Sequence, residues 1–179
     1  MDPDLDRFLL TWIGGACRHV PDDSPFDVLD PRFAGRDPDN RWNAPGQPTF
    51  YLAGDHGVAL AEFARHYPAH RRPDVGRGAE VRRVYDLDLR LDRVLDLRAT
   101  EVWDALAIKG APACFLDRSV TRQISSLVRS TAAQAILVPS VAFLDDPARW
   151  VLAVFLEKVP PPERFVTAVR KDGAFRVEP

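Results

Sequence analysis

The stretch NRWNAPGQPTFYLA, residues 40–53, ends in a short run of apolar and aromatic residues. From Pro48 onward it predicts a strand, because the apolar run is bounded on both sides by turn formers. The turn GDHG at residues 54–57 follows, and Asp55 is a suitable cap for a helix that continues to about Tyr67. The sequence therefore predicts an irregular segment, a strand, a tight turn and an amphipathic helix in immediate succession.

The chain before this stretch has two contrasting parts. An apolar repeat at helical spacing over residues 5–13 predicts a short amphipathic helix that ends at Gly14-Gly15. Residues 21–48 instead hold six prolines and several aspartates with almost no periodicity, so we expect a long irregular segment there. Segments of this length inside a compact domain are usually functional when they are not disordered.

The chain after the helix mixes strands and helices without strict alternation. A basic loop is expected at residues 68–78, and helices are expected near residues 100–107 and over residues 119–130. The predicted strands are residues 80–89, 93–97, 135–138, 150–156, 164–169 and 174–177. This order favours a single α+β domain with mixed, mostly antiparallel sheet and flanking helices over a doubly wound parallel sheet.

Composition excludes several classes of protein. The chain has 179 residues, the size of one domain, and its 24 basic and 26 acidic residues give a net charge of −2, which argues against direct nucleic-acid binding. Two cysteines are too few for a disulfide scaffold and form no pair spaced for zinc, so we expect no metal site. The acidic N-terminus and the lack of a long apolar run predict a cytoplasmic protein that does not contact the membrane.

Several common catalytic motifs are missing from the sequence. It contains no glycine-rich dinucleotide or Walker-type loop, no H-E-x-x-H and no G-x-S-x-G. Conventional Rossmann, P-loop, zincin and esterase functions are therefore not expected. The residues that still need an explanation are the NRWNAPGQPTFYLA stretch and the segment Ala59-Leu60-Ala61-Glu62 on the following predicted helix.

These two segments together resemble the signature of the RES domain, a family named for an arginine, a glutamate and a serine. In that signature R-W-N-x-x-G leads into a Y-x-A strand and a helix bearing A-x-x-E. Residues 17–20 (CRHV) resemble the earlier arginine segment of the family, residues 85–97 its middle hairpin, and residues 136–140 (ILVPS) its late strand and serine. The chain departs from the pattern at residues 147–150 (PARW), where the family often has an asparagine-led strand.

The resemblance implies one RES-like domain over residues 1–179 with a fold like that of ADP-ribosyltransferases. Within it we expect an N-terminal helix in residues 1–15, the core of the resemblance in residues 16–158 and C-terminal strands in residues 159–179. Characterised members are toxins of toxin–antitoxin pairs that destroy NAD by phosphorolysis or hydrolysis of the nicotinamide–ribose bond. The resemblance thus implies NAD as substrate, inorganic phosphate as a possible co-substrate, no prosthetic group, and an Xre-type antitoxin with a helix-turn-helix DNA-binding domain as partner.

Five residues are candidates for the site. Cleavage of the bond to nicotinamide builds positive charge on the ribose, which the carboxylate of Glu62 can stabilise. Arg41 and Arg18 can hold phosphate groups, and Tyr51 can stack on nicotinamide or donate a hydrogen bond. We expect catalytic roles for Glu62, Arg41 and Tyr51 and substrate-binding roles for Arg18 and Ser140, which can bond the substrate amide or a phosphate oxygen.

Each of these residues also has a structural interpretation, as a solvated helix glutamate, a cation that pins a loop, a core aromatic or a turn former. Two other functions also stay open at this stage. An ADP-ribosyltransferase would pass the ribosyl group to a macromolecule, and an inactive nucleotide-binding or interaction module would bind NAD without releasing nicotinamide.

Overall fold

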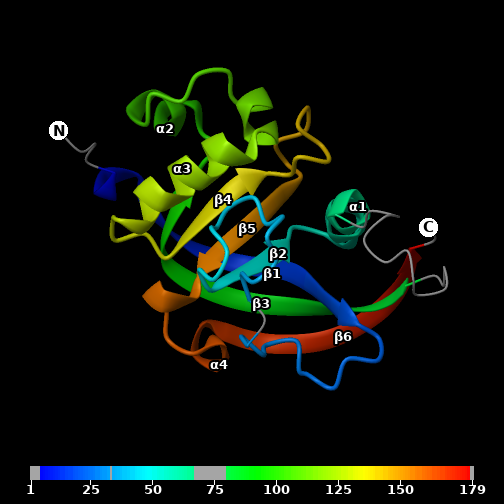
Figure 1. Ribbon diagram of the computed structural model, residues 1–179. Coiled ribbons are helices and arrows are strands. Elements are labelled where there is room, and N and C mark those ends of the chain that lie inside the picture. Colours follow the sequence, from blue (N-terminus) through cyan, green and yellow to red (C-terminus); the bar gives the residue numbers. More distant parts are fainter. Residues whose placement is uncertain (1–4, 33, 67–79, 178–179) are drawn as a thin grey trace.

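The computed structural model describes residues 5–32, 34–66 and 80–177 (Figure 1). The predicted basic loop at residues 68–78 lies outside the described residues. Among the described residues, no helix is long and apolar enough to span a membrane. The helical elements are η1 (Asp6–Phe8), α1 (His56–His66), α2 (Thr100–Ala105), η2 (Ala113–Leu116), α3 (Arg118–Arg129), η3 (Leu156–Lys158) and α4 (Pro162–Phe165). The strands are β1 (Leu9–Pro21), β2 (Thr49–Ala53), β3 (Glu80–Asp96), β4 (Ala135–Pro139), β5 (Trp150–Phe155) and β6 (Val166–Val177).

The six strands form one strongly bent sheet in the order β1-β2-β5-β4-β3-β6 (Figure 1). In addition β1 pairs with β3, so the pairings among β1, β2, β5, β4 and β3 form a closed circuit. Of the strand pairings in the described part of the chain, only β3–β4 is parallel. The long strand β3 makes this closure possible, because β1 follows one edge while β6 and then β4 occupy the other.

The two faces of the sheet bury different cores, because successive side chains on a strand point to opposite faces. On β2, Phe50 and Leu52 belong to a cluster inside the closed circuit, to which β1, β3, β4 and β5 also contribute. Tyr51 lies on the other face, which packs against α2, η2 and α3. Figure 1 shows α2 and α3 over β4 and β5, while α1 stands at the end of β2.

The predicted strand, turn and helix around residues 48–67 are confirmed as β2 and α1. Asp55 caps α1 as expected, because its Oδ1 accepts a hydrogen bond of 2.8 Å from the amide of Val58. Val58 and Ala59 are buried on the inner side of the helix against β1 and β2. The turn and this packing fix the direction in which α1 leaves the sheet.

The helix predicted within residues 1–15 is wrong. From residue 5 onward, where the structure describes this segment, only Asp6–Phe8 is helical, and Leu9–Pro21 forms β1. This segment pairs with β3 along its length, from Leu9 opposite Leu95 to Pro21 opposite Arg82. The pairing outweighs the helical spacing of the apolar residues. Gly14 does not end a helix but leaves room beside the indole of Trp12, its neighbour on the same face of the strand.

Two further boundaries differ from the prediction. The expected hairpin of residues 80–97 is the single strand β3, because no turn former interrupts it and paired strands line both its edges. The expected pair of C-terminal strands is likewise one strand, β6, preceded by the short helix α4. The break expected between those two strands is a bulge: Lys171 and Gly173 have partners on β3, whereas the intervening Asp172 has none in the register.

Candidate functional site

Glu62 lies on the middle of α1 and reaches the loop that follows β4. Its Oε1 accepts hydrogen bonds from Ser140 Oγ at 2.5 Å and from the amide of Ala142 at 3.2 Å. Ser140 is fully buried at the end of β4, whereas Glu62 is partly exposed. Among the described residues, every hydrogen bond to the Glu62 carboxylate falls on Oε1. One carboxylate oxygen is therefore fixed by the protein, and Oε2 has no hydrogen-bond partner in that part of the chain.

Arg41 lies in the irregular segment before β2 and is pinned to the end of η2. Its Nη1 donates to the carbonyl oxygens of Phe115 at 2.9 Å and Leu116 at 2.7 Å. Burial and the nearby cation Arg118 lower the pKa of Arg41, while the charge of Glu62 acts in the opposite direction. The Arg41 guanidinium is thus a partly desolvated cation in the electrostatic neighbourhood of the Glu62 carboxylate.

Tyr51 fixes the backbone beside Arg41. Its hydroxyl accepts a hydrogen bond from the amide of Trp42 at 3.0 Å and donates one to Asn43 Oδ1 at 2.7 Å. Burial raises the pKa of Tyr51 above its ordinary value, so the phenol stays protonated at neutral pH. Its hydroxyl group is committed to the loop, and its ring belongs to the core beneath α3.

Arg18 lies apart from these residues. It sits on β1 with its guanidinium 3.8 Å from the centre of the Phe50 ring, on the face of β2 opposite Tyr51. Its Nη1 donates to the carbonyl of Val28 at 2.7 Å. Burial lowers the pKa of Arg18 to about 10, which still leaves a cation at neutral pH. The structure therefore brings Glu62, Ser140, Arg41 and Tyr51 to one face of the sheet and places Arg18 on the other.

Comparison with protein families matches residues 16–177 to the RES domain. The chain belongs to the RES domain family. The match includes all five residues that the sequence predicted for the site. No curated protein gives a significant match to this chain.

Seven chains of known structure match this RES domain. One of them comes from the crystal structure of the M. tuberculosis MbcT–MbcA toxin–antitoxin complex. It has a TM-score of 0.63 and 20% sequence identity, and the match covers 96% of this chain and 88% of that one. This likeness confirms the predicted fold class, a single α+β domain with a mostly antiparallel sheet and flanking helices.

The RES signature also contains residues whose roles the sequence did not reveal. Asn43, only 1% exposed, donates through Nδ2 to the carbonyls of Gly35 and Ala44. Two buried hydroxyls of α3 hold the neighbouring backbone, since Thr121 donates to the Arg41 carbonyl at 2.9 Å and Ser125 to the Trp42 carbonyl at 2.6 Å. The available signal is this pair of small polar residues, four apart, on the face of α3 that also buries Ile124 and Val128.

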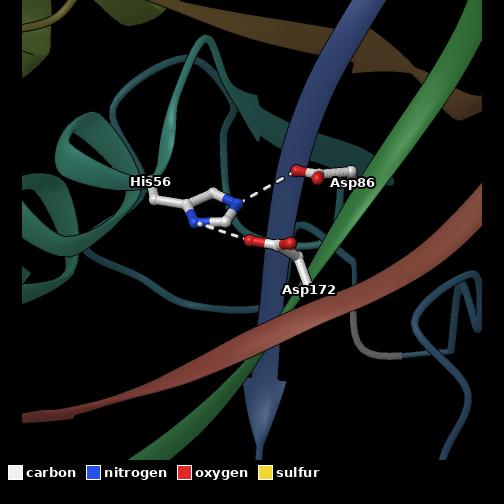
Figure 2. A group of neighbouring side chains, drawn as sticks. All are labelled: His56, Asp86 and Asp172. Atoms are coloured by element: carbon white, nitrogen blue, oxygen red, sulfur yellow. Dashed lines mark hydrogen bonds and ion pairs between the residues drawn. The ribbon is translucent and has the colours of Figure 1, made fainter.

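One other cluster of ionisable side chains lies where α1 begins. Figure 2 shows His56 between Asp86 of β3 and Asp172 of β6, with Nε2 3.0 Å from one carboxylate and Nδ1 3.4 Å from the other. Among the described residues, this is the group whose donor atoms lie close enough together, within 4.8 Å, to hold a metal ion. Each carboxylate thus faces a different ring nitrogen of His56.

Proposed function

We propose that this RES domain is an NAD-consuming enzyme that cleaves the bond between nicotinamide and ribose by phosphorolysis or hydrolysis. The observation that carries the proposal is the carboxylate of Glu62, fixed through Oε1 and unpartnered at Oε2 among the described residues, in a chain that belongs to the RES family. A carboxylate held in this way is preorganised to stabilise positive charge without having to reorient during the reaction.

In the proposed reaction the bond between the ribose C1′ and the pyridine nitrogen breaks. Nicotinamide leaves with the bonding electron pair as a neutral molecule, and the ribosyl carbon becomes cationic, as in other glycosidic transition states. An oxygen of inorganic phosphate, or of a water molecule that releases one proton to the solvent, then bonds to that carbon. Glu62 stabilises the cationic centre, and removal of one preorganised charge of this kind typically costs about 100-fold or more in rate.

The negative diphosphate of the substrate needs a cationic partner, and we assign that role to Arg41. Its attachment to the carbonyls of Phe115 and Leu116, together with the contacts of Tyr51 to the neighbouring backbone, supports a rigid guanidinium near Glu62. Tyr51 then acts in catalysis through the position of the loop. Direct contact between Tyr51 and nicotinamide remains a prediction, and so does a phosphate-binding role for Arg18.

For Ser140 we propose that its hydroxyl orients Glu62. Its burial and its 2.5 Å hydrogen bond to Oε1 favour this role over direct contact with the substrate. A Ser140→Ala variant would then retain affinity for NAD and lose turnover.

We further propose that the chain is the toxin of a toxin–antitoxin pair and that a small antitoxin of the Xre type silences it. Membership in the RES family and the likeness to a chain of the MbcT–MbcA toxin–antitoxin complex support this proposal. Expression of the wild-type chain alone should slow bacterial growth, and growth should recover on co-expression of the antitoxin. Harmless overproduction of an enzyme with high NAD-cleaving activity would contradict the toxin assignment.

The reaction itself is tested by incubating the purified chain with NAD in the presence and absence of inorganic phosphate and measuring product masses. Free nicotinamide should appear in a phosphate-dependent reaction with a phosphorylated ADP-ribose, or in a phosphate-independent reaction with ADP-ribose. Transfer of the label to a protein or nucleic acid would instead favour an ADP-ribosyltransferase. Tight NAD binding without nicotinamide release would indicate an inactive nucleotide-binding module.

A further inference from the structure

The loop of residues 140–149, between β4 and β5, contacts α1 at two separate points. At its beginning, Ser140 and Ala142 hold the carboxylate of Glu62. At its end, Nη2 of Arg149 lies 3.3 Å from Oδ1 of Asp55, the same atom that caps the first turn of α1. Since Asp55 and Glu62 lie about two helical turns apart, the loop extends along the N-terminal half of α1.

The Arg149 side chain is packed tightly where it meets α1. Its guanidinium carbon lies 4.0 Å from the centre of the Phe143 ring, within the same loop. A Cβ atom added to Gly57, in the first turn of α1, would lie 2.6 Å from Nη2 of Arg149. The guanidinium therefore lies between the Phe143 ring of the loop and the backbone of α1 at Gly57. Any larger residue at position 57 would obstruct this position.

The backbone of the loop connects these two points rigidly. Three turns follow one another, with hydrogen bonds of 3.0 Å from Phe143 to Ser140, from Asp146 to Phe143 and from Arg149 to Asp146. The amide of Ser140 then donates to the carbonyl of Arg149 at 2.8 Å, which closes the loop at its base. A displacement of Arg149 therefore moves the backbone that presents the Ala142 amide and the Ser140 hydroxyl to Glu62.

From this geometry we propose that Arg149 is a positioning residue for Glu62. It clamps the 140–149 loop to the start of α1 and so sets the distance between the Glu62 carboxylate and its two hydrogen-bond donors. The inference rests on the proposed function, in which Glu62 is the group that stabilises the ribosyl cation.

The expected effect falls on turnover more than on stability. The Asp55–Arg149 pair is partly exposed, and pairs of this kind contribute only about 0–1 kcal/mol to stability. A small misplacement of a catalytic group, in contrast, can lower the rate by about 10–100-fold. Loss of Arg149 should thus reduce kcat for nicotinamide release while the KM for NAD and the unfolding temperature change little.

The test compares Arg149→Met, Arg149→Lys and the control Arg90→Met by steady-state kinetics of nicotinamide release. Arg90 pairs with Asp92 on its own strand and is exposed, so its loss controls for removal of a surface cation. We expect Arg149→Met to lower kcat about tenfold with KM within twofold, Arg149→Lys to recover part of the loss, and Arg90→Met to match the wild type. Equal kcat values for Arg149→Met and Arg90→Met would overturn the inference.

A second readout separates positioning from a general structural role. In the Ser140→Ala background, Arg149→Met should lower kcat by a clearly smaller factor than it does in the wild type, because both changes act through the same contact to Glu62. Hydrogen exchange of the Ala142 amide should also be faster in Arg149→Met than in Arg90→Met. Additive kinetic effects together with unchanged Ala142 exchange would contradict the inference. If the wild-type chain releases no nicotinamide, the proposed function fails, and the exchange measurement alone decides the role of Arg149.

Discussion

At the scale of single residues, burial determines the protonation state of His19. His19 on β1 is packed between Phe63 and Phe175, with ring centroids at 5.0 and 5.3 Å, and its Nδ1 accepts a hydrogen bond from Arg82. Burial, followed by the charges of Arg82 and Arg18, lowers the pKa of His19 from 6.5 to about 3. In the folded protein His19 is therefore a neutral hydrogen-bond acceptor.

This arrangement predicts a pH-dependent stability. The unfolded chain binds a proton at His19 below pH 6.5, whereas the folded chain resists protonation until about pH 3, so stability is lost as the pH falls across this window. One such group contributes a slope of at most about 1.4 kcal/mol per pH unit. His19→Gln should be less stable than the wild type at pH 8, and urea unfolding should show the difference shrinking between pH 6.5 and pH 4. A difference that stays constant with pH would contradict the buried neutral state of His19.

Single residues also mark the limit of what the sequence revealed about the site. Glu62, Arg41 and Ser140 stood out because their side chains carry obvious chemistry in a recognisable pattern. The Ala142 amide that holds Glu62 has no side-chain signal, and Arg149 was visible only as a departure from the family pattern. The position of Arg18 could not be foreseen, because the choice between the two faces of β1 depends on strand pairing that the local sequence does not specify.

At the scale of elements, the irregular segment before β2 is a packed structure. Gly35 has a positive φ of 73°, and a Cβ atom there would lie 1.9 Å from the carbonyl oxygen of Gln47. Gly46 also has a positive φ, 88°, but an added Cβ atom would meet nothing within 4 Å. Alanine at position 46 would therefore add backbone strain alone, whereas alanine at position 35 would add both backbone strain and a steric clash.

We expect Gly46→Ala to lower the unfolding free energy by about 1 kcal/mol, the cost of strain alone. Gly35→Ala should lower it by at least about 3 kcal/mol, because the methyl group displaces the backbone around Gln47. Denaturant unfolding of the two variants measures both values. Equal destabilisation by the two variants would show that the backbone around Gly35 adjusts easily to a methyl group. The segment before β2 would then not be rigid enough to fix the position of Arg41.

The elements were predictable to different degrees, for physical reasons. The strand, turn and helix of residues 48–67 have local signals, namely turn formers, a cap and an amphipathic stripe, and they were predicted correctly. The long strands β1 and β3 were predicted wrongly because their extended form depends on their pairing with each other. This pairing overrides the helical spacing of the apolar residues in β1 and the turn that was expected within β3.

At the scale of the whole molecule, the closed circuit of strands divides the predicted residues between two environments. The α+β class followed from the order of the elements. Closure through the β1–β3 pairing did not, since that pairing joins residues 61 (Pro21 and Arg82) to 86 (Leu9 and Leu95) positions apart in the sequence. Glu62, Ser140, Arg41 and Tyr51 share the face covered by the helices, and α1 and the 140–149 loop meet there. We therefore propose that the reaction takes place on that face and that Glu62 has the central role.

The most direct test of this assignment is the rate of nicotinamide release from NAD by the wild-type chain and by Glu62→Gln, which keeps the size of the side chain and removes its charge. With both proteins equally folded by circular dichroism, we expect Glu62→Gln to lose at least about 100-fold in kcat. Equal rates for the two proteins would contradict the assignment.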